Sequence, residues 1–199
     1  MHRPAEPLRK SIHLAVGFLP LATWWAIDAW PVPTRVALAI LAVTALALDR
    51  LRPAWPAWNQ FLDGMIGPLM RPEERRGWLG STLLAVVVSL SFLLFPRTIA
   101  LAAMLFLIVG DAAAALVGGR FGRHRWVGHA TLEGSLACLA GALAVIPLVA
   151  WLDPRVARGA LVAGAVVATL VEAVVPGRWD NLAVPLASGA AVRLVTMGH

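Results

Sequence analysis

The sequence contains no tyrosine, one cysteine, one lysine and few charges of either sign. Only 14% of its 199 residues are charged, against about 25% in an average soluble domain. The one cysteine, Cys138, excludes a disulfide bond within the sequence and a zinc site built from cysteines. The scarcity of charge also excludes a disordered chain, which needs high charge and low hydrophobicity.

Apolar residues are abundant: 59% of the chain is hydrophobic and the mean hydropathy is +0.76. A soluble domain of this size leaves roughly a third of its unfolded-chain surface in water and cannot hide so much apolar surface. We therefore predict an all-α, polytopic integral membrane protein with about seven (six to seven) transmembrane helices in a single domain, residues 1–199. The apolar runs that predict these helices are 11–27, 33–48, 78–95, 98–119, 136–152, 159–175 and 182–197, of which the second and last are short.

The net charge of +6 comes from arginines that stand singly or in small groups between the apolar runs. This distribution is typical of orientation signals and argues against nucleic-acid binding. Most of the basic residues fall on the side of the N-terminus, which predicts a cytoplasmic N-terminus in the inner membrane. Residues 50–76 mix aromatic and charged side chains, so we expect an interfacial segment on the cytoplasmic leaflet rather than a span.

Three carboxylates lie within or at the edge of the apolar runs: Asp111, Glu133 and Glu172. An Asp at the centre of a membrane helix costs about 2.5–3.5 kcal/mol, so its presence calls for a reason. Pro176 and Asp180 follow Glu172 at four and eight residues. Glu172 and Asp180 therefore face one pocket if the helix is kinked, rather than ended, at the proline.

Each of these polar residues also has a purely structural interpretation. Asp111 can be a packing residue that a neighbouring hydroxyl satisfies, and Glu133 can belong to a helix N-cap in which Ala130 is a poor cap. Asp180 and Asn181 can cap the last helix. Other residues with such readings are Arg120, Arg123 and Arg125 (orientation), Arg9 and Lys10 (helix anchor), His13 (buried histidine) and Cys138 (packing).

Taken together, the polar residues favour a nucleotide site. Carboxylates near one membrane face can hold a divalent cation, which prefers hard oxygen ligands. A glycine-rich turn followed by basic residues offers backbone amides and positive charge to a polyphosphate. The residues of this expected turn are Gly118, Gly119, Arg120, Gly122, Arg123, His124, Arg125 and His129.

Five segments carry a more specific pattern. RKSIHLAVG fits R-K-x-x-H, GDAAAALVGGRFG fits D-x-x-A-x-x-x-G-x-x-x-G, and the segment from Glu172 to Pro185 fits E-x7-D-N-L-x-V-P. ATLEGS fits K-[ST]-x-E-G-[ST] except at its first residue, and RPEERRGWLGST is the loosest match, at Glu74 and Thr82. This set, in this order, resembles the family of dolichol kinases, phytol kinases and CTP-dependent diacylglycerol kinases.

The resemblance implies that the domain is catalytic and transfers the γ-phosphate of CTP to a membrane lipid alcohol (phytol, polyprenol or dolichol, or diacylglycerol), with Mg²⁺, at the cytoplasmic face. We expect Mg²⁺ to be held by Asp111, Asp180, Glu133 and Glu172, and the alcohol proton to go to His13 or Asp180. Lys10 is expected to neutralise phosphate charge. The expected nucleotide-binding residues are Gly118, Gly119, Arg120, Gly122, Arg123, Arg125, His129, Thr131, Gly134, Ser135 and Asn181.

One departure from the family pattern and two other functions remain open. Ala130 stands where the family usually has Lys, with His129 and Arg125 near enough in sequence to replace it. The GGRFGRHRW stretch also resembles the CDP-lipid synthases, but WDNLAVP replaces their H-G-G-x-x-D-R-x-D element. A small membrane transporter is disfavoured because no two-half repeat is evident and the polar residues collect at one face.

Overall fold

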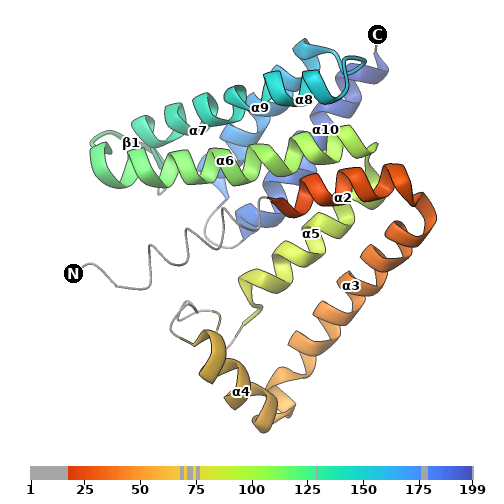
Figure 1. The fold of residues 1–199 in the computed structure, drawn as a ribbon. Helices are drawn as coiled ribbons and strands as arrows, with labels where there is room; N and C mark the ends of the chain where they lie inside the picture. Colours follow the sequence, from red (N-terminus) through yellow and green to blue (C-terminus); the bar gives the residue numbers. More distant parts are fainter. Residues whose placement is uncertain are drawn as a thin grey trace.

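A computed structural model describes residues 18–67, 70, 74, 77–128, 130–175 and 179–198. This part of the chain is nearly all helical, so the all-α prediction is correct except for one small hairpin (Figure 1). The hairpin pairs β1 (Arg125–Val127) with β2 (Ala130–Thr131) in antiparallel fashion. The helices are α2 (Phe18–Ala29), α3 (Pro31–Leu51), the short 3-10 helix η1 (Arg52–Ala54), α4 (Pro56–Ile66), α5 (Gly80–Leu94), α6 (Arg97–Phe121), α7 (Leu132–Ala144), α8 (Ile146–Leu152), α9 (Arg158–Val174) and α10 (Asp180–Met197).

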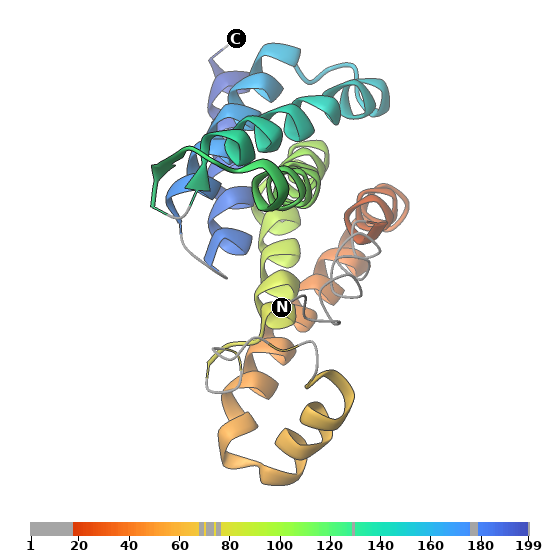
Figure 2. The ribbon, with the colours of Figure 1, turned by 90° about the vertical axis from the view of Figure 1, so that its left-hand side faces the viewer.

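Helix α6 forms the centre of the fold. Nearly every residue of its first half is buried, as expected for a helix that is hydrophobic on all sides. Helices α2, α5, α7, α9 and α10 all pack against it, and Figure 2 looks nearly along its axis. Asp111 and Arg120 come in the second half of α6, toward the hairpin, beyond the buried first half.

In the part of the chain that the structure describes, three helical stretches are long and apolar enough to cross a membrane: Pro31–Ala54, Arg97–Phe121 and Leu132–Leu152. Helix α5 is apolar but has 15 residues. The first stretch corrects the prediction of a short second run, because α3 continues through the charged residues at its end and spans 21 residues. Much of its apolar surface faces outward; Val32 is 68% exposed and Val43 is 67% exposed. An apolar surface turned outward over such a length fits contact with lipid.

Helices α6 and α7 approach each other along a seam of glycines. A Cβ on Gly118 would lie 3.2 Å from Gly134 Cα, and a Cβ on Gly141 would lie 3.0 Å from the Val109 carbonyl oxygen. Small residues of this kind let helix backbones pack closely in membranes. The seam fixes α7 and the hairpin before it against the polar half of α6.

Gly141→Val is expected to lower the free energy of unfolding by about 1–3 kcal/mol, because the side chain overlaps α6. Gly159→Val is the matched control, since a Cβ there meets nothing within 4 Å. Thermal unfolding in detergent, followed by tryptophan fluorescence, should show a lower midpoint for Gly141→Val and little change for Gly159→Val. Equal midpoints for the two variants would show that the seam does not require glycine.

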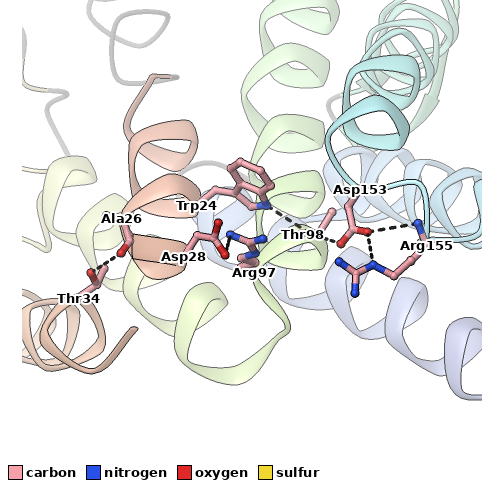
Figure 3. A network of polar contacts seen from close by, with 8 residues as sticks. All are labelled: Trp24, Ala26, Asp28, Thr34, Arg97, Thr98, Asp153 and Arg155. Atoms are coloured by element: carbon pink, nitrogen blue, oxygen red, sulfur yellow. Dashed lines mark hydrogen bonds and ion pairs between the residues drawn. The ribbon is translucent and has the colours of Figure 1, made fainter. Parts of the chain in front are cut away.

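The start of α6 lies at the opposite end of the molecule from the hairpin and carries a polar network (Figure 3). Arg97 pairs with Asp28 and lies over the Trp24 ring, 4.5 Å from its centroid. The Trp24 indole donates to Thr98, and Thr98 donates to Asp153. Burial raises the pKa of Asp153, but hydrogen bonds from Thr98 and Arg155 outweigh it and hold the pKa below its usual range. The network joins α2, α6 and the α8–α9 turn at this end.

A buried ion pair anchors the corner between α3 and α5. Asp49 and Arg52 lie 3.1 Å apart, and their side chains are only 2% and 3% exposed. Asp49 Oδ2 accepts from the Leu79 amide at 2.7 Å, and Arg52 donates to the carbonyl oxygens of Glu74 and Gly77. The pair therefore satisfies the backbone that leads into α5.

Helix α4 follows this corner and has no buried residue. Trp55 and Phe61 are each 54% exposed, and the Trp58 and Phe61 rings stack 5.5 Å apart. In Figure 1, α4 lies apart from the α6-centred bundle. The position of segment 50–76 on the cytoplasmic leaflet stays a prediction, as do the seven spans and the orientation.

Candidate functional site

The carboxylates of Asp111 and Glu172 come together between α6 and α9. Both residues are partly buried, and Asp111 is near enough for its charge to act on Glu172. Among the described residues, the Glu172 Oε2 atom is buried and has no hydrogen-bond partner. Two acidic groups held near each other, one with an unsatisfied oxygen, form a place where a cation or a proton is strongly favoured.

Cys138 of α7 and Thr169 of α9 lie beside the two carboxylates. The Cys138 thiol lies within electrostatic range of the Glu172 and Asp111 carboxylates. It is also within hydrogen-bonding distance of the Thr169 hydroxyl. Thr169 also donates to the Ala165 carbonyl oxygen at 3.0 Å. The thiol is buried and does not face solvent.

Asp111 lies on a face of α6 whose later residues are exposed. Ala115 and Gly119 follow Asp111 at four and eight residues, and both are exposed. A Cβ on Gly119 would meet nothing within 4 Å. The helix face that begins at Asp111 is therefore open toward the hairpin end of the molecule.

Gly118 and Gly119 lie inside α6, which corrects the expected glycine-rich turn. The helix continues to Phe121, and Gly118 faces Gly134 across the seam with α7. Gly122 lies beside Thr131, where a Cβ would come within 2.8 Å of the threonine side chain. Glycines spaced by four are required here for close packing. Binding of a nucleotide by Gly118, Gly119 and Gly122 stays a prediction.

Thr131 directly precedes α7 and is its N-cap, which corrects the interpretation of Ala130 as the cap. Its hydroxyl accepts from the Gly134 amide at 3.2 Å. Ser135 is buried and accepts a hydrogen bond from the Trp126 indole at 3.1 Å. Of the residues predicted to bind nucleotide, Thr131, Gly134 and Ser135 thus build the junction between the hairpin and α7.

Glu133 supports the loop before the hairpin. Its Oε2 atom accepts from the Arg123 and His124 amides at 3.2 and 3.3 Å, and Oε1 lies 2.7 Å from His124 Nδ1. This carboxylate already has several partners, unlike that of Glu172. Arg120, Arg123 and Arg125 are exposed on and around the same hairpin. Glu133 therefore holds the loop between α6 and β1, which carries Arg123.

Asp180 and Asn181 begin α10 rather than continuing α9. Helix α9 ends at Val174 and α10 begins at Asp180, so the helix is ended and not kinked near Pro176. The Asn181 amide donates to Asp180 Oδ1 at 2.6 Å. Within the described residues, no three His, Cys, Asp or Glu side chains come close enough together to hold a metal ion by themselves.

Several predicted site residues lie outside the described residues. These are Lys10, His13 and His129; Pro176, the position of the expected kink, also lies outside them.

Sequence reasoning missed two kinds of neighbour to the site. Thr169 precedes Glu172 by three residues on α9, and this helical spacing was a usable signal. Trp126 was not predicted as a site residue, although its position directly after Arg125 of the expected phosphate site was a usable signal. Cys138 carried no such signal, because an apolar run of this kind normally hides packing cysteines.

Comparisons with known proteins identify relatives whose sequences are similar to much of this chain. The CTP-dependent diacylglycerol kinase 1 of Schizosaccharomyces pombe is 31% identical over 134 residues, 64% of this chain and 59% of that protein. The protein of the same name from Eremothecium gossypii is 34% identical over 136 residues, 66% of this chain and 42% of that protein. The phytol kinase of Synechocystis is 28% identical over 192 residues, 93% of this chain and 77% of that protein. The chain is thus similar to proteins named CTP-dependent diacylglycerol kinase and phytol kinase.

The resemblance predicted from the motifs is thereby confirmed. The chain spans 59% and 42% of the length of the two fungal relatives. No family model matches the sequence, and no solved structure matches it at a significant level.

Proposed function

We propose that this protein is a lipid-alcohol kinase that transfers the γ-phosphate of CTP to the hydroxyl group of a membrane lipid alcohol. The observation that carries the proposal is the Asp111–Glu172 pair, whose unsatisfied oxygen lies among apolar helices. The relatives named as CTP-dependent diacylglycerol kinases and a phytol kinase support both the donor and the class of acceptor.

The acidic pair fits Mg²⁺ bound together with a nucleotide. Mg²⁺ in phosphate-transfer sites is held by one or two carboxylates, while substrate phosphates and waters complete its six ligands. Asp111 and Glu172 would supply the two carboxylates, and the unpartnered Glu172 Oε2 is the kind of oxygen that a cation requires. Asp180 and Glu133 are the further ligands implied by the family resemblance. When bound, the ion neutralises charge on the transferring phosphoryl group.

Arginines at the hairpin would hold the phosphates of the donor. Phosphoryl transfer depends mostly on positioning and charge neutralisation, which guanidinium groups provide by bidentate hydrogen bonds. Arg123 and Arg125 are exposed, and the Glu133 carboxylate fixes the backbone that carries Arg123. Lys10 would add a further cation. In the transfer, the alcohol oxygen bonds to the γ-phosphorus, the bond to the β-phosphate oxygen breaks, and CDP leaves.

The acceptor would reach the site through the bilayer. Phytol, polyprenols and diacylglycerol each carry a primary hydroxyl on an apolar tail, which outward-facing apolar helices can accommodate. The proton of that hydroxyl would pass to His13 or Asp180, either of which can act as a general base.

The proposed site faces the cytoplasm if the orientation predicted from the basic residues is right. The end of α6, the hairpin and the start of α7 lie together in Figure 1, opposite the Arg97 end of α6. The 25 residues of α6 separate these ends by about 37 Å, the depth of a membrane. One end of the fold therefore gathers the candidate phosphate-binding groups.

An assay with purified protein in detergent micelles tests the proposal. The protein is incubated with Mg²⁺, γ-labelled CTP and, separately, phytol, a polyprenol and diacylglycerol, and extracted lipids are identified by mass. We expect label in the monophosphate of at least one of these alcohols. Absence of any labelled lipid, with CTP or with ATP as donor, would overturn the proposal.

A further inference from the structure

The indole of Trp126 is hydrogen-bonded at its Nε1 edge, while the faces of its ring are not covered by another planar group among the described residues. Its Nε1 atom donates to Ser135 Oγ at 3.1 Å, and Ser135 is only 5% exposed, so this contact fixes the orientation of the indole. The tryptophan itself is 46% exposed. Across the described ranges, no other aromatic ring and no guanidinium group is stacked on it. An aromatic ring that is fixed in orientation and exposed on its face can stack with another planar group.

The indole and Glu172 lie at the same level along helices α7 and α9, on the hairpin side of Cys138 and Thr169. Cys138 of α7 and Thr169 of α9 are in contact, and the chain returns along α9 in the direction opposite to α7 (Figure 1). Ser135 precedes Cys138 by three residues, and Glu172 follows Thr169 by three, so both lie one turn farther toward the hairpin. The Ser135–Trp126 hydrogen bond is therefore at the level of Glu172.

The hairpin also contacts the end of α9. Gly128 has a φ of +52° and forms the turn, and a Cβ there would lie 3.9 Å from the Ala173 carbonyl oxygen. Ala173 is the neighbour of Glu172. The turn thus holds the strand of Trp126 against the helix that carries the unsatisfied carboxylate. Arg123 and Arg125, both exposed, precede Trp126 in the same short segment.

We propose that Trp126 is a nucleotide-binding residue on whose indole the cytosine ring of CTP stacks; this rests on the proposed function. Bases stack readily on aromatic side chains, and positive charge beside the ring tracks the phosphates. The arrangement gives the base and the phosphates separate partners: Trp126 contacts the ring, and the arginines contact the triphosphate. Trp126 contributes to affinity for the donor and takes no part in moving the phosphoryl group.

Equilibrium dialysis of the purified protein in micelles, with Mg²⁺ and either CTP or inorganic tripolyphosphate, tests the stacking. Trp126→Ala should weaken CTP binding by about tenfold, a typical loss for one stacked base. It should leave tripolyphosphate binding within about twofold of wild type, because that probe has no base. Trp126→Phe, which keeps a flat ring, should recover most of the CTP affinity. Trp151→Ala is the matched control, since Trp151 is 77% exposed at the other end of the molecule and should change neither constant.

Two outcomes would overturn the inference. Equal loss of CTP and tripolyphosphate affinity in Trp126→Ala would mean that the indole supports the hairpin and does not contact the base. Unchanged affinity for both probes would mean that Trp126 only anchors the hairpin at the membrane interface. The kinase assay on the same wild-type preparation keeps the two proposals apart. If the wild-type protein phosphorylates lipid and Trp126→Ala binds CTP with unchanged affinity, only the stacking proposal fails. If Trp126→Ala loses CTP affinity as expected but the wild-type protein phosphorylates no lipid, only the kinase proposal fails.

Discussion

Asp111→Asn is expected to reduce lipid phosphorylation by about 10³-fold while the protein remains folded. The asparagine keeps the shape of the side chain but removes the negative charge that, with Glu172, would hold Mg²⁺. Loss of a group that neutralises charge in phosphoryl transfer reduces kcat by roughly 10³-fold or more. The initial rate at saturating CTP and lipid is the measurement.

Asp63→Asn is the control for this variant. Asp63 lies on α4, which belongs to the corner beyond α3 and not to the acidic pair. It should keep nearly the full rate. Both proteins should unfold at about the wild-type temperature, since replacing one of two repelling carboxylates does not weaken the packing of α6. A wild-type rate for Asp111→Asn would remove this residue from the chemistry.

Arg52→Met is expected to lower the free energy of unfolding by about 3–5 kcal/mol. Removal of one partner of a buried ion pair leaves the other charge buried and uncompensated. Here it leaves Asp49 without its cation and the carbonyl oxygens of Glu74 and Gly77 without their donor. Reversible unfolding by denaturant in mixed micelles measures the change.

Two further variants separate the effect of burial from that of charge. The double variant Asp49→Leu/Arg52→Met should recover part of the loss, because apolar residues can replace a buried pair at little cost. Arg155→Ala should cost no more than about 1 kcal/mol, since the Arg155 side chain is 91% exposed in its pair with Asp153. If Arg52→Met were as mild as Arg155→Ala, the corner would not depend on the pair.

Hydrophobic runs predicted the helices well, because a helix in lipid must be apolar over its length. The run 98–119 became α6, Arg97–Phe121, and the run 159–175 became α9, Arg158–Val174. Helix α3 was longer than its run, because Asp49 is satisfied by a partner one turn later and does not need water. The split between α7 and α8 follows the proline at position 147, which cannot donate its backbone nitrogen to the helix.

The candidate site could be only partly predicted, because its residues meet through packing between helices. Asp111 and Glu172 are 61 residues apart in sequence, and the expected metal groups did not include their actual neighbours Cys138 and Thr169. The glycines at 118 and 122 have the same spacing in a helix seam as in a loop that binds phosphate. Sequence alone could not separate these interpretations, and only the contact of Gly118 with Gly134 shows the packing role.

The position of the transferred phosphorus tests the central claim most directly. Two parallel reactions use CTP labelled at the α- or the γ-phosphate, with the lipid alcohol that the assay identifies. A lipid-alcohol kinase must place the γ-label in the lipid and leave the α-label in CDP. Entry of the α-label into the lipid, with release of pyrophosphate, would contradict the account, because the enzyme would then transfer the cytidylyl group and not the γ-phosphoryl group.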